Sequence, residues 1–278
     1  MIVALRVELA KIFSKWRTFI GFIVLAIVVP IVIVSMGAEG MQYFSFATQG
    51  LQRVFTITGN LMNGYSASYL LIGMLYVHIP FLVTLVAGDT LAGEATAGTY
   101  RLILTRPISR FTMVTSKYIA TLLSTTALVA FLAVLSLGLG IAMLGTGEVV
   151  VLKSKITILA SNDALWRFAL AYGYGALAMC TVSSIAFFLS AIVENAIGPI
   201  MTTMGIIIGL LILSSISSSW MDSVRPWFFT SHINAWRYFF DQAPEWGTIV
   251  HSTLVLFGYC IACYVGAVFV MYRKDILT

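Results

Sequence analysis

Six long apolar runs, separated by polar segments, dominate the pattern of this chain. Each run is long enough to cross a hydrocarbon core about 30 Å thick, which needs about 20 helical residues. A very short turn at Glu194–Asn195 joins the fourth and fifth runs, so these two should form an antiparallel hairpin. The pattern predicts one all-α polytopic membrane domain over residues 1–278. Its six predicted spans are Thr18–Met36, Tyr65–Ala87, Tyr118–Leu144, Phe168–Val193, Ile197–Ile216 and Thr248–Tyr272.

Residues 1–17 carry a different pattern, which is typical of an amphipathic helix. Apolar side chains recur at helical spacing and fall within an arc of roughly 100°. Lys11 and Lys15 lie on the opposite side. Such a helix lies in the headgroup plane, with its lysines toward anionic lipid or a protein. The apolar positions are Ile2, Leu5, Leu9, Ile12, Phe13 and Trp16.

The polar stretch from Asp89 to Lys117 lies between the second and third runs. It contains residues that typically begin and end short helices. Asp89 can cap a turn through Gly93 and Glu94. Gly93 and Gly98 permit sharp bends of the backbone. Thr99, after Gly98, can cap a second helix over residues 100–105, which Pro107 then ends, and Ser109 can cap a third. The sequence therefore predicts short helices separated by a break, an arrangement suited to docking on another molecule. The alternative is an interfacial loop whose arginines only fix the topology.

Composition and charge place the chain in a membrane and orient it. Apolar residues make up 60% of the chain, charged residues only 10%, and the mean hydropathy is +0.97. The net charge of +5 therefore reports topology more than an affinity for nucleic acid. With a cytoplasmic N-terminus, ten of the 16 basic residues fall on the inside. We therefore expect both termini and the stretch 89–117 to be cytoplasmic.

The segments predicted to lie outside are longer than simple turns. Val149–Val151 is a β-branched run, and Asn162–Asp163 is a turn or a cap. Residues 217–247 hold four of the six tryptophans, which usually anchor a protein at headgroup level. Contact with a substrate is the alternative. Within this segment, His232–Asp241 reads as a short amphipathic helix, with an apolar side made by Ile233, Trp236, Phe239 and Phe240.

Motifs for chemistry are few. The chain has no G-x-x-x-x-G-K-[ST] phosphate loop and none of the common hydrolase motifs, so we expect neither an enzyme nor a bound cofactor. Cys260 and Cys263 form a C-x-x-C without a second pair, which favours packing over a metal site. His78, next to the kink-prone Ile79-Pro80, is the one ionisable residue well inside a run. It either lines a substrate pathway or bonds to a neighbouring helix. Gly205 and Gly209 suit close packing within the chain or across a dimer.

The residues of the stretch 89–117 resemble the cytoplasmic signature of ABC-type export permeases of the NosY-like branch. The resemblance lies in Gly88-Asp89, Gly93-Glu94, Ala97-Gly98-Thr99-Tyr100-Arg101, Thr105-Arg106-Pro107-Ile108-Ser109-Arg110 and Lys117. Tyr100 stands where the family usually has leucine. The order of six apolar runs after an amphipathic N-terminal helix also resembles this family along the whole length of the chain.

This resemblance implies a permease of the bacterial inner membrane that pairs with a second permease copy or a homologous permease. It implies docking of a separate cytoplasmic ATPase dimer, which would bind ATP and Mg²⁺, and small re-entrant helices in 217–247. A periplasmic or accessory protein is a further implied partner. The implied docking residues are Asp89, Gly93, Glu94, Gly98, Thr99, Tyr100, Arg101, Arg106, Pro107, Ser109 and Arg110. A membrane scaffold that recruits a cytoplasmic partner without transport is the alternative.

Overall fold

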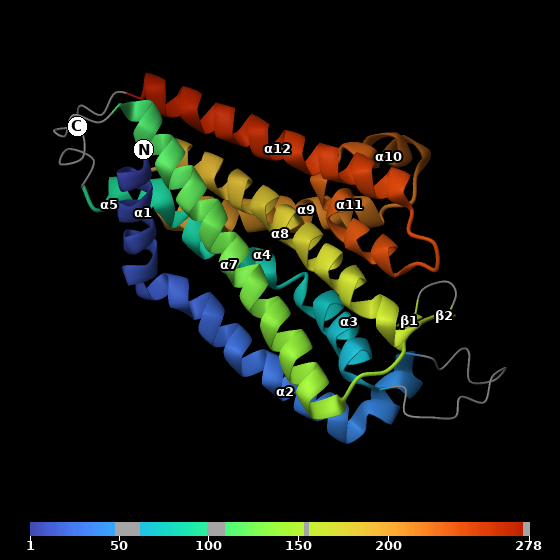
Figure 1. Cartoon of the computed structure of the whole chain (residues 1–278). Helices are drawn as coiled ribbons and strands as arrows, with labels where there is room; N and C mark the ends of the chain where they lie inside the picture. Colours follow the sequence, from blue (N-terminus) through green and yellow to red (C-terminus); the bar gives the residue numbers. More distant parts are fainter. Residues whose placement is uncertain (48–61, 99–108, 153–155, 275–278) are drawn as a thin grey trace.

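The computed structural model describes residues 1–47, 62–98, 109–152 and 156–274, and it is almost entirely helical (Figure 1). The long helices run side by side as a bundle. The elements at the N-terminal half are α1 (Ile2–Ser14), α2 (Trp16–Ala47), α3 (Gly64–Leu75), α4 (Ile79–Ala87), α5 (Asp89–Thr96) and α7 (Arg110–Leu144). Those that follow are β1 (Val149–Leu152), β2 (Ile156–Leu159), α8 (Ser161–Ile192), α9 (Ile197–Ser215), α10 (Ser219–Val224), η1 (Arg225–Trp227), α11 (Phe229–Ile233), η2 (Asn234–Phe240) and α12 (Trp246–Arg273).

Within the described residues, five helices are long and apolar enough to cross a membrane: α2, α7, α8, α9 and α12. The helix pair α3–α4 passes the same test only when its two halves are taken together, and it bends by 56° between them. The prediction of an all-helical protein with several apolar spans is confirmed to this extent. The β-branched run Val149–Val151 forms β1, which pairs antiparallel with β2.

Helix α8 is the central element of the bundle. In its most apolar window 72% of the residues are buried, against 22–28% in the other four candidate spans. Figure 1 shows α8 between α7 and α12. Small residues let helices approach closely: a Cβ on Gly64 of α3 would lie 2.4 Å from the carbonyl carbon of Gly140 in α7. The predicted Gly205 and Gly209 have no heavy atom within 4 Å of such a Cβ among the described residues, so they do not pack closely within this part of the chain.

The bend between α3 and α4 follows from Pro80. Proline lacks an amide hydrogen and is favoured in the first turn of a helix, and here it is the second residue of α4. Just before the break, the His78 amide bonds to the Leu75 carbonyl, and the His78 ring Nδ1 lies 3.1 Å from the Met74 carbonyl oxygen. His78 therefore bonds back to α3, whereas one of our two alternatives was a bond to a neighbouring helix, and its side chain is exposed.

The segment before α12 packs into the protein core. The predicted apolar side of residues 232–241 is confirmed, because Ile233, Trp236, Phe239 and Phe240 are all buried. The helix type differs from the prediction: the segment is the end of α11 followed by the 3-10 helix η2. Trp236 is 1% exposed, so it is a core residue and not a headgroup anchor, whereas Trp220, Trp227 and Trp246 are exposed.

Long-range hydrogen bonds fasten this segment to the bundle. The hydroxyl groups of Tyr76 and Tyr174 donate to the carbonyls of Ile233 (2.8 Å) and His232 (2.6 Å). The buried guanidinium of Arg167 donates to the carbonyl of Phe239 at 2.7 Å. Turns and short helices expose backbone groups that need partners in an apolar environment. Side chains of α3 and α8 supply these partners here.

Candidate functional site

The described ends of the chain, α1 and α5 lie at one end of the bundle, opposite the end that carries β1, β2, α10 and α11 (Figure 1). This end holds the start of the stretch 89–117. Helix α5 follows α4 after the single residue Gly88, whose backbone is also helical. The candidate site is therefore a direct extension of a bundle helix.

The start of α5 is capped by a side chain from another helix. The Ser190 hydroxyl of α8 accepts hydrogen bonds from the amides of Leu91 (3.1 Å) and Ala92 (2.8 Å), and it donates to the Gly88 carbonyl at 2.6 Å. We expected Asp89 to cap this turn, which is wrong: α5 has no capping bond from an adjacent side chain. Because Ser190 is distant in sequence, local pattern cannot identify it.

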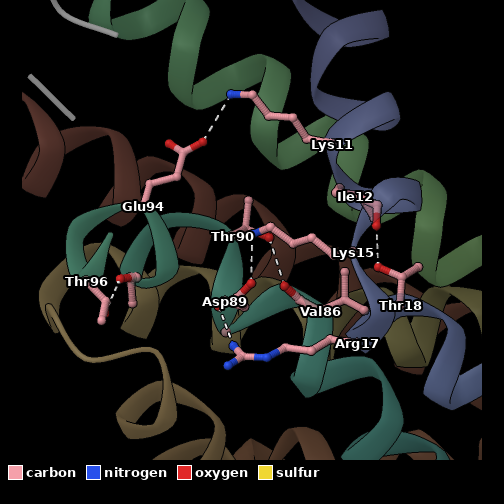
Figure 2. A network of polar contacts seen from close by, with 12 residues as sticks. Lys11, Ile12, Lys15, Arg17, Thr18, Val86, Asp89, Thr90, Glu94 and Thr96 are labelled. Carbon is pink, nitrogen blue, oxygen red and sulfur yellow. Dashed lines mark hydrogen bonds and ion pairs between the residues drawn. The ribbon is translucent and has the colours of Figure 1, made fainter. Parts of the chain in front are cut away.

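Asp89 instead forms ion pairs with the elbow between α1 and α2. Its Oδ2 accepts from Lys15 Nζ at 2.8 Å, and its Oδ1 accepts from Arg17 Nη1 at 2.6 Å (Figure 2). Gly93 makes room for this carboxylate, because a Cβ on Gly93 would lie 2.3 Å from Asp89 Oδ1. Gly93 lies inside α5, so our expectation that it permits a sharp bend is wrong.

Lys117 joins three helices. Its ammonium, on α7, donates to Glu8 Oε2 of α1 at 2.7 Å and to Glu94 Oε1 of α5 at 2.6 Å. Lys11 bonds to the same two carboxylates, at 2.9 Å and 3.2 Å. The Lys117 side chain is only 1% exposed, so these charge-assisted bonds lie in a largely dehydrated setting. The residues Glu8, Lys11, Lys15, Arg17, Asp89, Glu94 and Lys117 are hereafter called the ion-pair cluster.

The ion-pair cluster shifts the pKa values of two side chains of α1, Glu8 and Lys11. Burial alone would raise the pKa of Glu8, but the charge and hydrogen bond of Lys117, together with Lys11, lower it below its ordinary value of 4.5. Burial would likewise lower the pKa of Lys11, and its bonds to Glu8 and Glu94 raise it above 10.5. Both groups are therefore charged near neutral pH, which keeps the ion pairs formed.

Helix α1 packs on the protein as well as facing outward. Ile12 is buried, Leu5 and Leu9 are half-buried, and Phe13 and Ile2 are exposed. The predicted continuous helix over residues 1–17 is wrong at its end: α1 stops at Ser14, Lys15 is extended, and Trp16 begins α2. The Thr18 hydroxyl donates to the Ile12 carbonyl at 2.5 Å and braces this elbow. The lysines face protein carboxylates, one of the two partners that we expected.

Two predictions for the stretch 89–117 are confirmed, one for the backbone of Gly98 and one for the cap at Ser109. Gly98 has φ +64°, a conformation that side chains other than glycine rarely adopt. Ser109 caps α7 by accepting from the Thr112 amide at 3.1 Å. Arg110 donates to the carbonyls of Met271, Tyr272 and Lys274 at the end of α12. The predicted docking residues Thr99, Tyr100, Arg101, Arg106 and Pro107 lie outside the described residues.

The structure does not bring His78 and the ion-pair cluster together, since His78 lies at the break between α3 and α4. Cys260 is buried and Cys180 and Cys263 are partly buried, and all three are free thiols. In the part of the chain that the structure describes, no group of three or more His, Cys, Asp or Glu side chains has the arrangement of a metal site. The candidate site is thus a set of ion pairs between helices.

A family model described as "Protein of unknown function (DUF2705)" matches residues 16–277 of this chain. The chain belongs to this family. The matched residues include Arg17, Asp89, Glu94 and Lys117 of the ion-pair cluster.

One curated relative is the "Uncharacterized protein YhcI" of Bacillus subtilis (strain 168). It is 26% identical over 147 residues, which are 51% of this chain and 46% of YhcI. The alignment therefore spans about half of each protein. Neither the family description nor that of YhcI assigns a reaction, a substrate or a partner, so the function has to be argued from the molecule itself.

Proposed function

We propose that this chain is the membrane-spanning permease subunit of an ATP-binding cassette export-type transporter. In this proposal α3–α4 is one bent span, which gives six spans with both termini in the cytoplasm of a bacterium. A separate cytoplasmic ATPase dimer, which binds ATP and Mg²⁺, docks on the stretch 89–117 and drives export or a conformational signal across the membrane. Six helices are few for enclosing a pathway, so a second permease copy or a homologous permease completes the unit.

The observation that carries this proposal is the way α5 is held. Helix α5 continues from α4 and is capped by Ser190 of α8. Its Asp89 is ion-paired to the elbow between α1 and α2, and its Glu94 is ion-paired to α1 and α7. A force applied just beyond its end at Gly98 therefore acts on α4, α8, α1, α7 and the elbow at once. This is the arrangement expected of a part that passes motion from a docked partner to the bundle, because a partner shifts a conformational equilibrium only through differential contacts.

The sequence supports the same interpretation. The stretch that begins with α5 resembles the cytoplasmic signature of ABC-type export permeases, and the chain has no phosphate loop of its own. A transporter of this kind must receive work through contact with a separate ATPase. The positive φ of Gly98 directs the chain out of α5 at a fixed angle, as a coupling segment requires.

A membrane scaffold is the second candidate. The exposed apolar faces and the ion-pair cluster would also suit a protein that only recruits a cytoplasmic partner. A scaffold needs a loop that binds, whereas a transporter needs a loop that binds and also moves the bundle. The rigid attachment of α5 to α8, the most buried of the five candidate spans, favours the transporter.

The test is to purify the full chain from native membranes and to identify the proteins that remain bound. We expect a soluble ATPase with a G-x-x-x-x-G-K-[ST] motif, and we expect its ATP turnover to change when the chain is reconstituted with it in lipid. A bound partner without such a motif would favour the scaffold. Binding of an ATPase whose turnover ignores the chain would contradict the transporter.

A further inference from the structure

A narrow crevice lies at the elbow between α1 and α2, against α4 and α5. Its polar lining includes Lys15, Arg17 and Asp89, and also the charged side chains of Glu8, Lys11 and Glu94. Its apolar wall is formed by Leu85 and Val86 of α4, with Ile12 of α1. The enclosed space is about 20 Å³. A space of this size holds about one water molecule, so any larger ligand has to lie across the mouth of the crevice.

Lys15, Arg17 and Asp89 together carry one net positive charge at an accessible surface, whereas Glu8 and Glu94 are balanced by their ion pairs with Lys11 and Lys117. Lys15 and Arg17 share the single carboxylate of Asp89, and their side chains are 44% and 52% exposed. An ammonium has three N–H groups and a guanidinium five, so these ion pairs leave further donors at the surface. An anion that approaches from outside meets two cations, of which Asp89 neutralises one.

The apolar wall continues along the span. A second crevice shares Thr18 and Val86 with the first and runs between α2, α4 and α7, past Phe22, Leu82 and Leu128. Arg17 lies in the first turn of α2, whose membrane-spanning stretch begins at Trp16. The charged end is therefore at the depth of lipid headgroups, and the apolar end is at the depth of acyl chains.

We propose that the crevice at the α1–α2 elbow is a binding site for an anionic phospholipid. The lipid phosphate accepts hydrogen bonds from Lys15 and Arg17, and one acyl chain lies along Val86 and Phe22. Basic side chains at a membrane surface attract anionic lipid in this way. The headgroup charge of the surrounding leaflet then acts on the contact between α1 and Asp89. This inference does not depend on the transporter function.

The experiment measures lipid binding to the delipidated full chain by native mass spectrometry, with phosphatidylglycerol compared to phosphatidylcholine. We expect clear preference for phosphatidylglycerol. Each basic side chain near an anionic surface contributes about fivefold, and Asp89 offsets part of this, so K15Q/R17Q should bind phosphatidylglycerol about tenfold more weakly. Arg6→Gln is the matched control, because Arg6 is an exposed cation of α1 outside the crevice. It should bind like the wild type.

Asp89→Asn separates binding by charge from a general loosening of the elbow. This variant removes the carboxylate that competes with the lipid and keeps both cations, so phosphatidylglycerol should bind at least as tightly as to the wild type. Glycerol phosphate at millimolar concentration should not displace the lipid, because it lacks the acyl chain. Equal binding of both lipids, a loss in D89N equal to that in K15Q/R17Q, or displacement by glycerol phosphate would each overturn the proposal.

Discussion

Lys117 is the residue at which α1, α5 and α7 meet. Its ammonium is almost inaccessible to water and bonds to two carboxylates that come from different helices. Removing water from a charge is costly, and here the two carboxylates compensate for that cost. Taking away the lysine leaves an excess of buried negative charge. The stability of this end of the molecule should therefore depend on Lys117 more than on any surface ion pair.

Lys117→Met should lower the free energy of unfolding by about 3 kcal/mol, the lower end of the range for breaking a buried pair, because Lys11 still bonds to both carboxylates. Thermal unfolding in detergent measures this loss. Lys274→Met is the control, since Lys274 pairs with the exposed Glu194 and should cost less than about 1 kcal/mol. Adding Glu8→Gln and Glu94→Gln to K117M should restore part of the stability. Equal effects of K117M and K274M would contradict this account.

The protonation of Glu8 sets an acid limit for the docking of α1. Its pKa in the folded chain lies below 4.5, so its contribution is fully present above that pH and is lost as the pH falls through the lowered value. Lys11, with a pKa above 10.5, contributes below that pH and stops contributing as the pH rises further. A spin label at Val3→Cys should keep the same mobility between these limits and become more mobile in acid. A transition near neutral pH would contradict the assignment.

At the scale of single residues, the sequence predicted the roles of some residues correctly and those of others not. The positive φ of Gly98 and the cap at Ser109 were predictable, because a few adjacent residues decide both. The cap of α5 was not, because Ser190 reaches it from another helix. Gly93 was misinterpreted for the same reason: the space it leaves is filled by a carboxylate that is held there by Lys15 and Arg17.

At the scale of elements, α1 is a separate unit attached to the bundle by one apolar contact face and by the ion-pair cluster. Its amphipathic pattern was readable from the sequence, because spacing alone reveals one apolar side. The sequence did not show which surface packs against that apolar side. The partners of Glu8 and Lys11 on other helices are 109 and 83 residues away in the chain, and no local pattern specifies such a distance.

Ile12→Asp should release α1 from the bundle. Ile12 is 6% exposed, and an unpaired charge there would be costly to bury. Because α1 joins α2 through the extended residue Lys15, it can detach while the bundle persists. Trypsin cleavage after Lys11 should then be at least about tenfold faster, since cleavage needs a locally opened backbone. Val3→Asp, at a position 75% exposed, is the control and should cleave like the wild type. Equal rates for the two variants would show that α1 is not docked.

The broken span and the segment before α12 illustrate what periodicity can reveal at this scale. Pro80 marked the break between α3 and α4 because its ring dictates the local backbone. The apolar side of residues 233–240 was also visible, but its burial in the core was not. That burial depends on Tyr76, Tyr174 and Arg167, which supply hydrogen bonds from α3 and α8.

At the scale of the whole molecule, the two ends of the bundle carry different structural features. The ion-pair cluster and the described termini lie at one end, and the hairpin β1–β2 lies at the other (Figure 1). In the orientation that we propose, the first end faces the cytoplasm, because basic residues are in excess on that side. The layout of apolar runs was predictable from length and hydropathy. The central place of α8 was not, since α8 has the lowest hydropathy of the five candidate spans and is nevertheless the most buried of them.

Cysteine labelling tests this orientation. In a background without Cys180, Cys260 and Cys263, a membrane-impermeant maleimide added to cells should label Ile158→Cys and not Ala97→Cys, both of which are exposed positions. After the cells are opened, A97C should be labelled as well. The reverse pattern would place the stretch 89–117 outside the cell and remove the basis for docking a cytoplasmic ATPase.

The central claim is that α5 and the bend at Gly98 pass motion from an ATPase to the bundle, and a pair of substitutions at Gly98 tests it most directly. A Cβ at Gly98 has no heavy atom of the described chain within 4 Å, so a new side chain adds backbone strain at φ +64° without a clash there. That strain is roughly 1–2 kcal/mol for valine, whereas asparagine visits this conformation readily. The measurement is ATPase binding and the change in ATP turnover that the reconstituted chain causes. We expect G98N to behave like the wild type, and G98V to bind the ATPase without changing its turnover. If G98V binds the ATPase and changes its turnover as fully as G98N does, rigid coupling through this bend is wrong.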